Sequence, residues 1–374
     1  MILFFYMDTD LKYPIALTMV KGVGPAIARK LITSLGDAKT VFEASRKELE
    51  SIPNVGRIIA SQIRKSDLLG RAERELLFLN KVGGRVLYFE DDAYPTRLKE
   101  CEDHPIVLYQ KGTMQMNVPR VIGVVGTRRM TPYGKDKVDS ILEELGARFP
   151  DLLVVSGLAH GVDGCAHRRS VELGLQTVGV VGHGLDMIYP AEHRSLSEKM
   201  MANGGLLTEF HSHCVVDRKN FVSRNRIIAG MSDIVLVVES GIKGGALLTA
   251  EFANSYNRDV GAIPGRVNDL YSMGCNNLIK TNRATLIESA TDILELMNWE
   301  EKKEDKPTMR KVSYENLTEK ERMIVNRLEM NGNMQLNVLA RELQLPMSDL
   351  SSLLFDMEMK DIVASSPGGM YGLK

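Results

Sequence analysis

The sequence predicts an α/β protein whose largest part is a doubly wound parallel sheet with helices on both faces. Short β-branched runs alternate with helical stretches between residues 119 and 298, the runs are apolar nearly throughout, and several end in glycine. Strands that are apolar on both faces are typical of parallel sheets covered by helices on each side. At 374 residues the chain is long enough for two or three domains, taking roughly 150 residues per domain.

Residues 1–80 precede this sheet and show helical periodicity interrupted by glycine and proline. The stretch Gly22-Val-Gly-Pro separates two short amphipathic helices, and Asn54-Val-Gly repeats the arrangement. The repeat resembles a tandem helix-hairpin-helix module of the SAM-like type, in which turn amides hold a DNA phosphate. Asn54 stands where the first copy has Gly22, which weakens the second phosphate site. The alternative is a packing domain whose glycines only make turns.

The predicted sheet domain spans residues 81–298. Its predicted strands are, in order, Val121–Val125, Leu152–Val155, Gln176–Val181, Asp233–Val238 and Val260–Ile263. Predicted helices include Pro132–Arg148, Arg224–Met231 and one that opens at Gly244-Gly245. Ligands bind an open parallel sheet beyond the carboxyl ends of its strands, where the strand order reverses. We therefore expect a binding site in the loops that follow these strands.

The residues in these loops indicate an anionic ligand. Three strands end in a glycine, where backbone amides can approach an anion closely, namely Gly126, Gly157 and Gly182. The first loop adds Arg128 and Arg129, and the segment 217–226 adds four cations around Phe221. Cations that bind phosphates beside a ring that stacks on a base predict a site for single-stranded nucleic acid.

The overall charge does not exclude such a site. A net charge of −1 argues against nucleic-acid binding only where charge is spread evenly. Residues 1–80 hold twelve basic and nine acidic residues, and the cations of the sheet domain gather in two loops. For Arg224 and Arg226, which precede an apolar Ile-Ile pair, the alternative is a buried ion pair. The carboxylates available for that pair are Glu209 and Glu239.

The end of the chain predicts a linker and a small third domain. Residues 299–317 are charged and rich in lysine and glutamate, which is typical of a linker. Residues 318–374 predict a winged helix, with a capping box at Thr318, helices over Leu336–Leu343 and Ser348–Lys360, and a final hairpin. The last helix is more acidic than basic, so we expect this module to bind protein, either its own copy or a partner, and not DNA.

Several common kinds of site are missing from the sequence. It has no GxxxxGK[ST] loop, no GxGxxG after the first strand and no GxSxG elbow, so no ATP-driven motor, NAD enzyme, serine hydrolase or cofactor is predicted. His160, Asp163 and His167 have a metal-like spacing, but glycines interrupt the turn, and no metal site is predicted. The apolar residues 1–7 lack the features of a signal peptide or membrane span, so we expect a cytoplasmic protein without membrane attachment.

Motifs across residues 80–298 occur in an order that resembles one protein family. They are Val-Val-Gly126-Thr-Arg128, Ser156-Gly-Leu-Ala-His-Gly161-Val-Asp163, Gly184-Leu-Asp-Met-Ile-Tyr-Pro190, Phe221-Val-Ser-Arg224-Asn-Arg and Ile263-Pro-Gly265. The series resembles the DprA family of DNA-processing proteins, also called Smf. The N- and C-terminal modules fit the layout of that family as well.

The resemblance implies a Rossmann-like fold, a homodimer and no enzymatic activity. It also implies a function in natural transformation and recombination, in which the protein protects incoming single-stranded DNA and loads the RecA recombinase. Arg128 and Lys219 match residues that line the strand-binding pocket in the family. The predicted DNA-binding residues are Gly126, Thr127, Arg128, Arg129, Ser156, Gly157, Gly161, Gly182, Lys219, Phe221, Arg224, Asn225, Arg226, Lys243 and Thr249.

One segment departs from the family pattern and keeps a second hypothesis open. The chain reads Ser240-Gly-Ile-Lys-Gly-Gly-Ala-Leu-Leu-Thr249-Ala-Glu251, which inserts Lys243 and Gly244 into a segment that is usually shorter. This variant loosely resembles the Gly-Gly-x-Gly-Thr-x-x-Glu segment of nucleotide phosphoribohydrolases of related fold. The alternative function is therefore a nucleotide hydrolase. Its acid or base would be Glu251 or Glu209.

Overall fold

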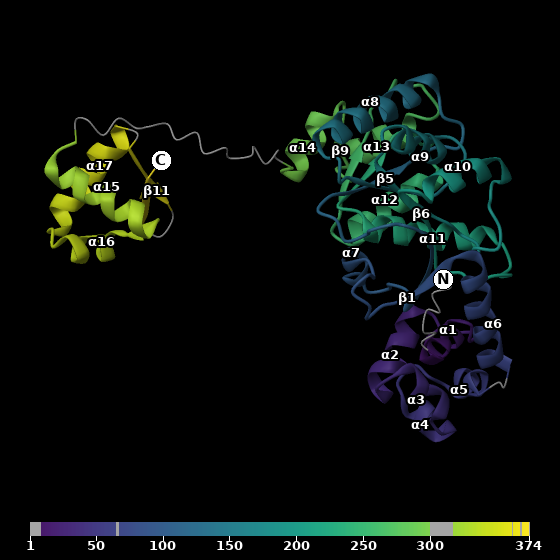
Figure 1. Ribbon diagram of the computed structural model, residues 1–374. Helices are drawn as coiled ribbons and strands as arrows, with labels where there is room; N and C mark the ends of the chain where they lie inside the picture. The colour runs from purple at the N-terminus through teal and green to yellow at the C-terminus, as the bar shows by residue number, and fades with distance from the viewer. Residues whose placement is uncertain (1–8, 65–66, 300–316, 361, 367–368, 374) are drawn as a thin grey trace, which may run out of the picture. The chain divides into compact units, whose positions relative to one another are not determined.

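The computed structural model describes residues 9–64, 67–299, 317–360, 362–366 and 369–373 (Figure 1). The chain separates into two compact units, residues 1–301 and 302–374. The predicted linker lies outside the described residues except at its two ends. The domain boundaries placed at residues 80 and 298 stay predictions.

A mixed sheet forms the centre of the first unit. Among the described residues it has nine strands, in the spatial order β1 (Gly84–Tyr88), β2 (Val107–Gly112), β6 (Gly204–Thr208), β5 (Gln176–Val180), β4 (Leu153–Ser156), β3 (Val121–Val125), β7 (Ile234–Val237), β8 (Asp259–Ala262) and β9 (Thr285–Leu286). From β6 through β5, β4, β3, β7 and β8 to β9, neighbouring strands pair in parallel. At the other edge β2 pairs antiparallel with β6, and β1 pairs antiparallel with β2. The doubly wound sheet is confirmed, and the antiparallel edge is a feature that the sequence pattern did not indicate.

Strand β6 was not predicted from the sequence, because it begins with two glycines, which are typical of a turn. In the structure Gly204 and Gly205 have φ angles of 138° and 143°, which favour glycine. A Cβ atom on Gly205 would lie 2.0 Å from the carbonyl oxygen of Lys111 in β2. The glycines therefore allow the antiparallel edge to pair closely with the parallel sheet.

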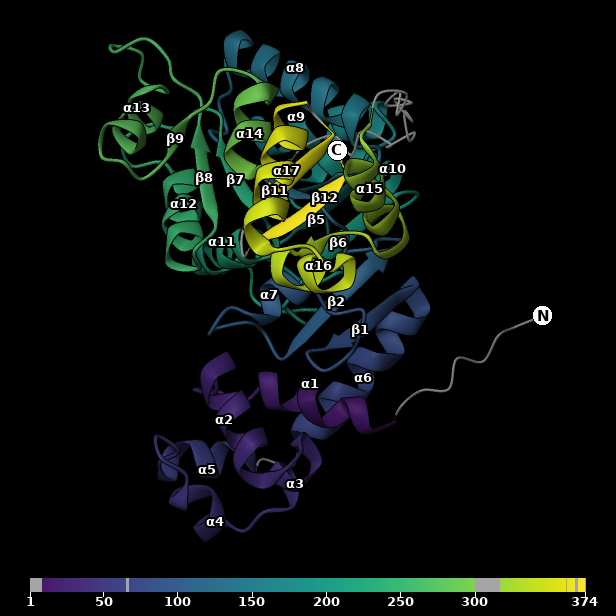
Figure 2. The ribbon, with the colours of Figure 1, turned by 90° about the vertical axis from the view of Figure 1, so that its left-hand side faces the viewer.

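Helices cover both faces of the sheet. They are needed on both, because successive side chains of a strand point to opposite faces and here both sets are apolar. Val121 and Val125 of β3 pack with one group of helices, whereas Ile122 and Val124 pack with the other. The first group is α7 (Thr96–Lys99), α11 (Arg218–Met231), α12 (Gly245–Ser255) and α13 (Met273–Lys280). The second group is α8 (Pro132–Arg148), α9 (Val162–Glu172) and α14 (Ala290–Met297). Helix α10 (Arg194–Met200) packs beside α9, and its Leu196 and Met200 belong to the cluster that the N-terminal helices share with the sheet. Figure 2 shows the two layers on either side of the strands.

The N-terminal helices form a layer beyond the β1–β2 edge of the sheet (Figures 1 and 2). They are α1 (Lys12–Thr18), α2 (Pro25–Leu35), α3 (Ala38–Glu43), α4 (Arg46–Ser51), α5 (Arg57–Ile63) and α6 (Asp67–Val82). Gly22 and Asn54 both adopt positive φ angles, 90° and 70°, so Asn54 makes the same kind of turn as Gly22. The apolar side chains of these helices share one core with Tyr109 and Leu206 of the sheet.

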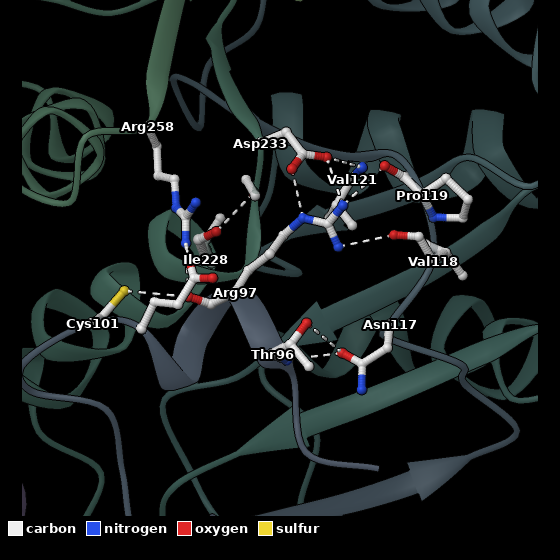
Figure 3. Close-up of polar contacts among 12 residues, drawn as sticks. Thr96, Arg97, Cys101, Asn117, Val118, Pro119, Val121, Ile228, Asp233 and Arg258 are labelled. Atoms are coloured by element: carbon white, nitrogen blue, oxygen red, sulfur yellow. Dashed lines mark hydrogen bonds and ion pairs between the residues drawn. The ribbon is translucent and has the colours of Figure 1, made fainter. Parts of the chain in front are cut away.

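A polar network around Arg97 and Asp233 joins the segment that precedes β3 to the sheet (Figure 3). Arg97 on α7 donates through Nε to Asp233 Oδ1 at 2.5 Å and through Nη2 to Oδ2 at 3.0 Å. The same guanidinium donates to the carbonyl oxygens of Val118 and Pro119 at 2.9 and 3.0 Å. Asp233 Oδ2 also accepts from the backbone N–H of Val121 at 2.7 Å. One mostly buried ion pair thus joins α7, the start of β3 and the start of β7.

The second unit has the winged-helix fold that the sequence predicts. Its elements are α15 (Glu319–Asn331), β10 (Met334–Gln335), α16 (Leu336–Leu343), α17 (Met347–Met359), β11 (Val363–Ser366) and β12 (Met370–Leu373). The strands pair antiparallel in the order β10-β12-β11. The capping box at Thr318 and the extent of α16 are confirmed, and α17 agrees within one residue at each end.

Glu321 joins the first and third helices of this unit. Its carboxylate accepts from the backbone and hydroxyl of Thr318 and forms an ion pair with Lys360 at 2.8 Å. The ion pair with Lys360, followed by the hydrogen bonds from Thr318, lowers the pKa of Glu321 to about 2 from the ordinary value of 4.5. Because the folded-state pKa is lowered, the carboxylate stabilises the fold above pH 4.5, and this contribution is lost as the pH falls toward 2.

We expect Glu321→Gln to reduce the local stability of α15 by about 1–2 kcal/mol at neutral pH, a range that allows for the exposure of Lys360. Amide hydrogen exchange across residues 319–331 in the full chain measures the change, with Glu319→Gln on the same turn as the matched control. The difference between wild type and Glu321→Gln should narrow between pH 4.5 and 2. A difference that stays constant over this interval would contradict the assigned interaction.

Candidate nucleic-acid interface

A cavity of about 1120 Å³ opens at the carboxyl ends of β3 and β7. Strand β3 is flanked by β4 on one side and β7 on the other, so the strand order reverses at this point. The loop after β3, the loop after β7, and the first turns of α11 and α12 line the cavity. This is where ligands bind open α/β sheets, and the backbone topology alone creates the opening.

Four cations from three segments line the cavity. They are Arg128 after β3, Arg218 and Arg224 on α11, and Lys243 in the loop before α12. Arg128, Arg218 and Lys243 are exposed, whereas the side chain of Arg224 is buried. Three exposed cations around an open cavity favour a polyanionic ligand.

Helix α11 begins at Arg218, earlier than the predicted start at Arg224. This earlier start decides which side chains of segment 217–226 line the cavity. The side chain of Asp217 accepts from the backbone N–H of Lys219 at 3.1 Å and caps α11, which begins at Arg218. Residues that line the cavity follow helical spacing: Arg218, Phe221, Val222, Asn225 and Ile228. Arg218 is one of the four cations that the sequence places in this segment, but it is not among the residues predicted to bind DNA.

Lys219 and Arg226 lie seven positions apart, on another face of α11, and neither lines the cavity. Lys219 is exposed. Arg226 is buried and forms an ion pair with Glu209, and its Nη1 also donates to the carbonyl oxygen of Asp103 at 2.6 Å. Arg226 therefore forms the ion pair that the sequence left open as the alternative, and its contact with DNA stays a prediction.

Arg224 and Asp163 form the buried floor of the cavity. The Nη1 atom of Arg224 donates to the carbonyl oxygen of Val180, at the end of β5. Burial lowers the pKa of Arg224 to about 10, so the guanidinium remains a cation at neutral pH. Burial also raises the pKa of the Asp163 carboxyl, against the opposing effect of Arg224. A Cβ atom on Gly157 would lie 2.0 Å from Arg224 Nη1 and 2.5 Å from Asp163 Oδ2.

The other predicted glycines allow close packing between neighbouring elements, and the expected approach of their amides to an anion stays a prediction. A Cβ atom on Gly126 would lie 2.5 Å from Val162, and one on Gly182 would lie 3.0 Å from Phe221. Gly161 has a φ of 74° and would place a Cβ 2.2 Å from the carbonyl oxygen of Thr127. Gly126 still contributes to the lining, whereas Gly161 and Gly182 act by packing.

Nine of the predicted DNA-binding residues line this cavity or the small adjoining one: Gly126, Thr127, Arg128, Gly157, Phe221, Arg224, Asn225, Lys243 and Thr249. Of the others, Arg129 is exposed in the loop after β3. The buried hydroxyl of Ser156 donates to the carbonyl oxygen of Val124. Gly161, Gly182, Lys219 and Arg226 are placed as described above. The structure therefore brings most of the predicted residues together at one edge of the sheet.

Aromatic and aliphatic side chains make up the rest of the lining. The rings of Tyr189 and Phe221 lie with centroids 5.6 Å apart, and Tyr271 lines the opposite loop. Around them are exposed aliphatic residues, namely Val216, Val222, Ile242, Leu248 and Leu270. Apart from Phe221, these residues are not among those predicted from the sequence, because loops that are far apart in the chain supply them. A binding surface that combines apolar side chains with exposed cations suits bases and phosphates together.

The carboxylates of the hydrolase hypothesis lie outside the cavity lining. Glu209 is buried against Arg226, and Glu251 on α12 pairs with Arg283 at 3.5 Å. Within the described ranges of the chain, no group of three or more His, Cys, Asp or Glu side chains is placed to hold a metal ion. His167 instead contacts the hydroxyl of Thr177 at 2.7 Å.

Comparison with known proteins assigns the family. Residues 85–298 match the family of DNA recombination-mediator protein A. The chain belongs to this family, that of DprA. Residues 15–66 match a SAM-like tandem helix-hairpin-helix, and residues 310–369 match the DprA winged-helix domain. Proteins of the DprA family are DNA-processing mediators and not catalysts, which removes the hydrolase hypothesis.

Individual relatives agree with this assignment. The chain is 34% identical to Protein Smf of Synechocystis sp. over 300 residues, which cover 77% of this chain and 72% of that protein. The crystal structure of DprA from Streptococcus pneumoniae superposes with a TM-score of 0.62 at 30% identity, over 76% of this chain and 97% of that one. DprA from Helicobacter pylori, described for its single-stranded DNA binding mode, gives a TM-score of 0.52 at 26% identity, over 58% of this chain and 96% of that one. None of the described helices is long and apolar enough to cross a membrane.

Proposed function

We propose that this DprA-family chain binds single-stranded DNA in the cavity at the ends of β3 and β7. The observation that carries the proposal is the composition of the lining, where Arg128, Arg218 and Lys243 line the same cavity as the rings of Tyr189 and Phe221. Exposed cations bind phosphates, and aromatic faces stack on bases without a preference for sequence. The relative from Helicobacter pylori, whose description names single-stranded DNA binding, supports the same ligand class.

The cavity favours single strands because its apolar lining can contact only bases that have left a duplex. In a duplex the base faces are stacked on one another, so they cannot reach Phe221 or the aliphatic residues beside it. Phosphates would meet Arg128 and Lys243, which are exposed and form no ion pair with another of the residues that the structure describes. The buried Arg224 and Asp163 add polar groups to the lining.

We place this binding within natural transformation and recombination. The protein would hold incoming strands in the cytoplasm, protect them from degradation and load the RecA recombinase onto them. A homodimer would present two cavities to one strand and so double the number of phosphate contacts without any new residue. Membership of the recombination-mediator family supports this role. The exposed acidic residues and Phe355 on α17 support protein binding by the winged helix.

We expect Arg128→Ala and Arg218→Ala each to weaken binding to an oligo-dT strand about five- to tenfold and to reduce the slope of log affinity against log salt by about one. Lys219→Ala tests the residue that the family resemblance indicates, and the same change is expected of it if the strand extends over the first turn of α11. Fluorescence anisotropy with labelled oligo-dT over a salt series measures both quantities.

Lys199→Ala is the matched control, because Lys199 is exposed on α10 and does not line the cavity. It removes one positive charge and should leave the affinity and the slope unchanged. Wild-type affinity in Arg128→Ala, Arg218→Ala and Lys219→Ala alike would overturn the proposed function.

A further inference from the structure

One wall of the cavity is an irregular segment, and the N-terminal helices hold it. Residues 209–217, which we call the wall segment, connect β6 to α11. Val216 and Asp217 of this segment line the cavity together with Arg218, the first residue of α11. The position of Arg218 therefore depends on how the wall segment is held.

Glu75 on α6 contacts the middle of the wall segment. Its two carboxylate oxygens accept from the backbone N–H of Ser212 at 2.9 and 3.0 Å, and Oε2 also accepts from the Ser212 hydroxyl. Glu75 is only 4% exposed. A buried carboxylate is costly unless several donors meet it, and here both donors come from one residue of the wall segment.

A second contact joins the same face of α6 to the wall segment. Phe78 lies one helical turn after Glu75, and its ring lies 6.4 Å from the ring of His213, centroid to centroid. His213 has a φ of 57°, and its Nδ1 lies 3.3 Å from Asp186 Oδ2. Asp186 belongs to the loop that carries Tyr189, another residue of the cavity lining. The wall segment is thus held between α6 and this loop.

Backbone packing leaves little room for the wall segment to take another path. A Cβ atom on Gly184 would lie 2.4 Å from the carbonyl oxygen of His211 and 2.7 Å from the Cα of Ser212. On the far side, Asn220 donates to the carbonyl oxygen of Val215 at 2.9 Å, and Asp217 caps α11. The wall segment is therefore held at its middle by Glu75 and at its end by the start of α11.

We propose that Glu75 is a positioning residue for single-strand binding, through which the N-terminal helices set the place of the cavity wall and of Arg218. The proposal rests on the proposed function, because it concerns the same cavity. It assigns to the N-terminal helices a part in strand binding that needs no direct contact with DNA. No side chain of α6 lines the cavity, so the effect passes through Ser212 and the wall segment.

The test compares Glu75→Ala with Glu73→Ala in the full chain. Glu73 lies on the same helix, is exposed and pairs only with Lys12 in the described structure, so its removal changes the charge equally. We expect Glu75→Ala to weaken oligo-dT binding about five- to tenfold and to lower the salt slope by about one, as loss of the Arg218 contact would. Glu75→Gln keeps one accepting oxygen and should recover part of the affinity. Glu73→Ala should bind as wild type.

The double variant Glu75→Ala with Arg218→Ala separates positioning from a general loss of structure. If Glu75 acts through Arg218, the double variant binds no more weakly than Arg218→Ala alone. Amide exchange should rise across residues 210–218 in Glu75→Ala and stay unchanged in β3, β4 and β5. Ser212→Ala, which removes one donor only, gives a milder variant with the same expected pattern.

Two results would overturn the positioning role. One is wild-type affinity and slope in Glu75→Ala when Arg218→Ala does weaken binding. The other is full additivity of the two substitutions. A failure of the proposed function gives a different result, because then Arg128→Ala and Arg218→Ala would also leave binding unchanged.

Discussion

Arg97→Ala is expected to lower the free energy of unfolding of the first unit by about 3–5 kcal/mol. The substitution leaves the mostly buried carboxylate of Asp233 with one remaining donor, the N–H of Val121. It also removes the donors to the carbonyl oxygens of Val118 and Pro119. Urea unfolding followed by circular dichroism and by the fluorescence of Trp299, the single tryptophan of the chain, measures the change.

Two companion variants test whether the geometry of the pair or only its charge is responsible. Arg97→Lys keeps the charge but cannot make the two parallel bonds to Asp233, so most of the loss should remain. Arg148→Ala removes an exposed arginine that pairs with Glu144 one helical turn away, and it should cost less than about 0.5 kcal/mol. A loss below 1 kcal/mol in Arg97→Ala, within the range of a surface pair, would refute the structural role of the network.

Gly157→Ala is expected to weaken single-strand binding about tenfold or more and to lower stability by about 1–3 kcal/mol. The added methyl group would lie 2.0 Å from Arg224 Nη1. The buried guanidinium must then move away from the carbonyl oxygen of Val180 and from Asp163, which disturbs the cavity floor. Anisotropy with oligo-dT and urea unfolding of the same preparation give the two quantities.

Gly70→Ala is the matched control for this substitution. A Cβ atom on Gly70, in α6, meets no atom nearer than 3.7 Å. Alanine there should be neutral or stabilise the helix by up to about 1 kcal/mol, and binding should not change. Wild-type affinity in a well-folded Gly157→Ala protein would show that the place of Arg224 does not matter for binding.

The periodic parts of the fold could be predicted from the sequence, and the sheet edge could not. The parallel strands are short apolar runs with clear boundaries, and Leu336–Leu343 combines helical spacing with flanking turn residues. By contrast, Gly204 and Gly205 indicate a turn, and only the close approach of β2 shows why glycine is needed inside a strand. A contact between segments that are far apart in the chain leaves no local pattern to detect.

The position of the candidate site at the strand ends, and the presence of arginines in it, could be predicted from the sequence. The direction of individual side chains could not. Arg128 follows an apolar strand directly, so its place at the end of β3 could be inferred. On α11, Arg218 and Lys219 are neighbours in the sequence, and only the helix cap at Asp217 decides which of them faces the cavity. Burial of Arg226 depends on Glu209 and Asp103, which no local spacing connects to it.

The shared core between the N-terminal helices and the sheet has a consequence for how the protein can evolve. Residues such as Leu31 and Leu79 belong to the same apolar cluster as Tyr109 and Leu206. The winged helix encloses a separate cluster of its own. A deletion of the N-terminal helices would therefore expose the apolar side chains of the sheet that belong to this cluster. Substitutions in the apolar face of the N-terminal helices are therefore constrained by the sheet that they pack against, whereas the apolar residues of the winged helix constrain one another.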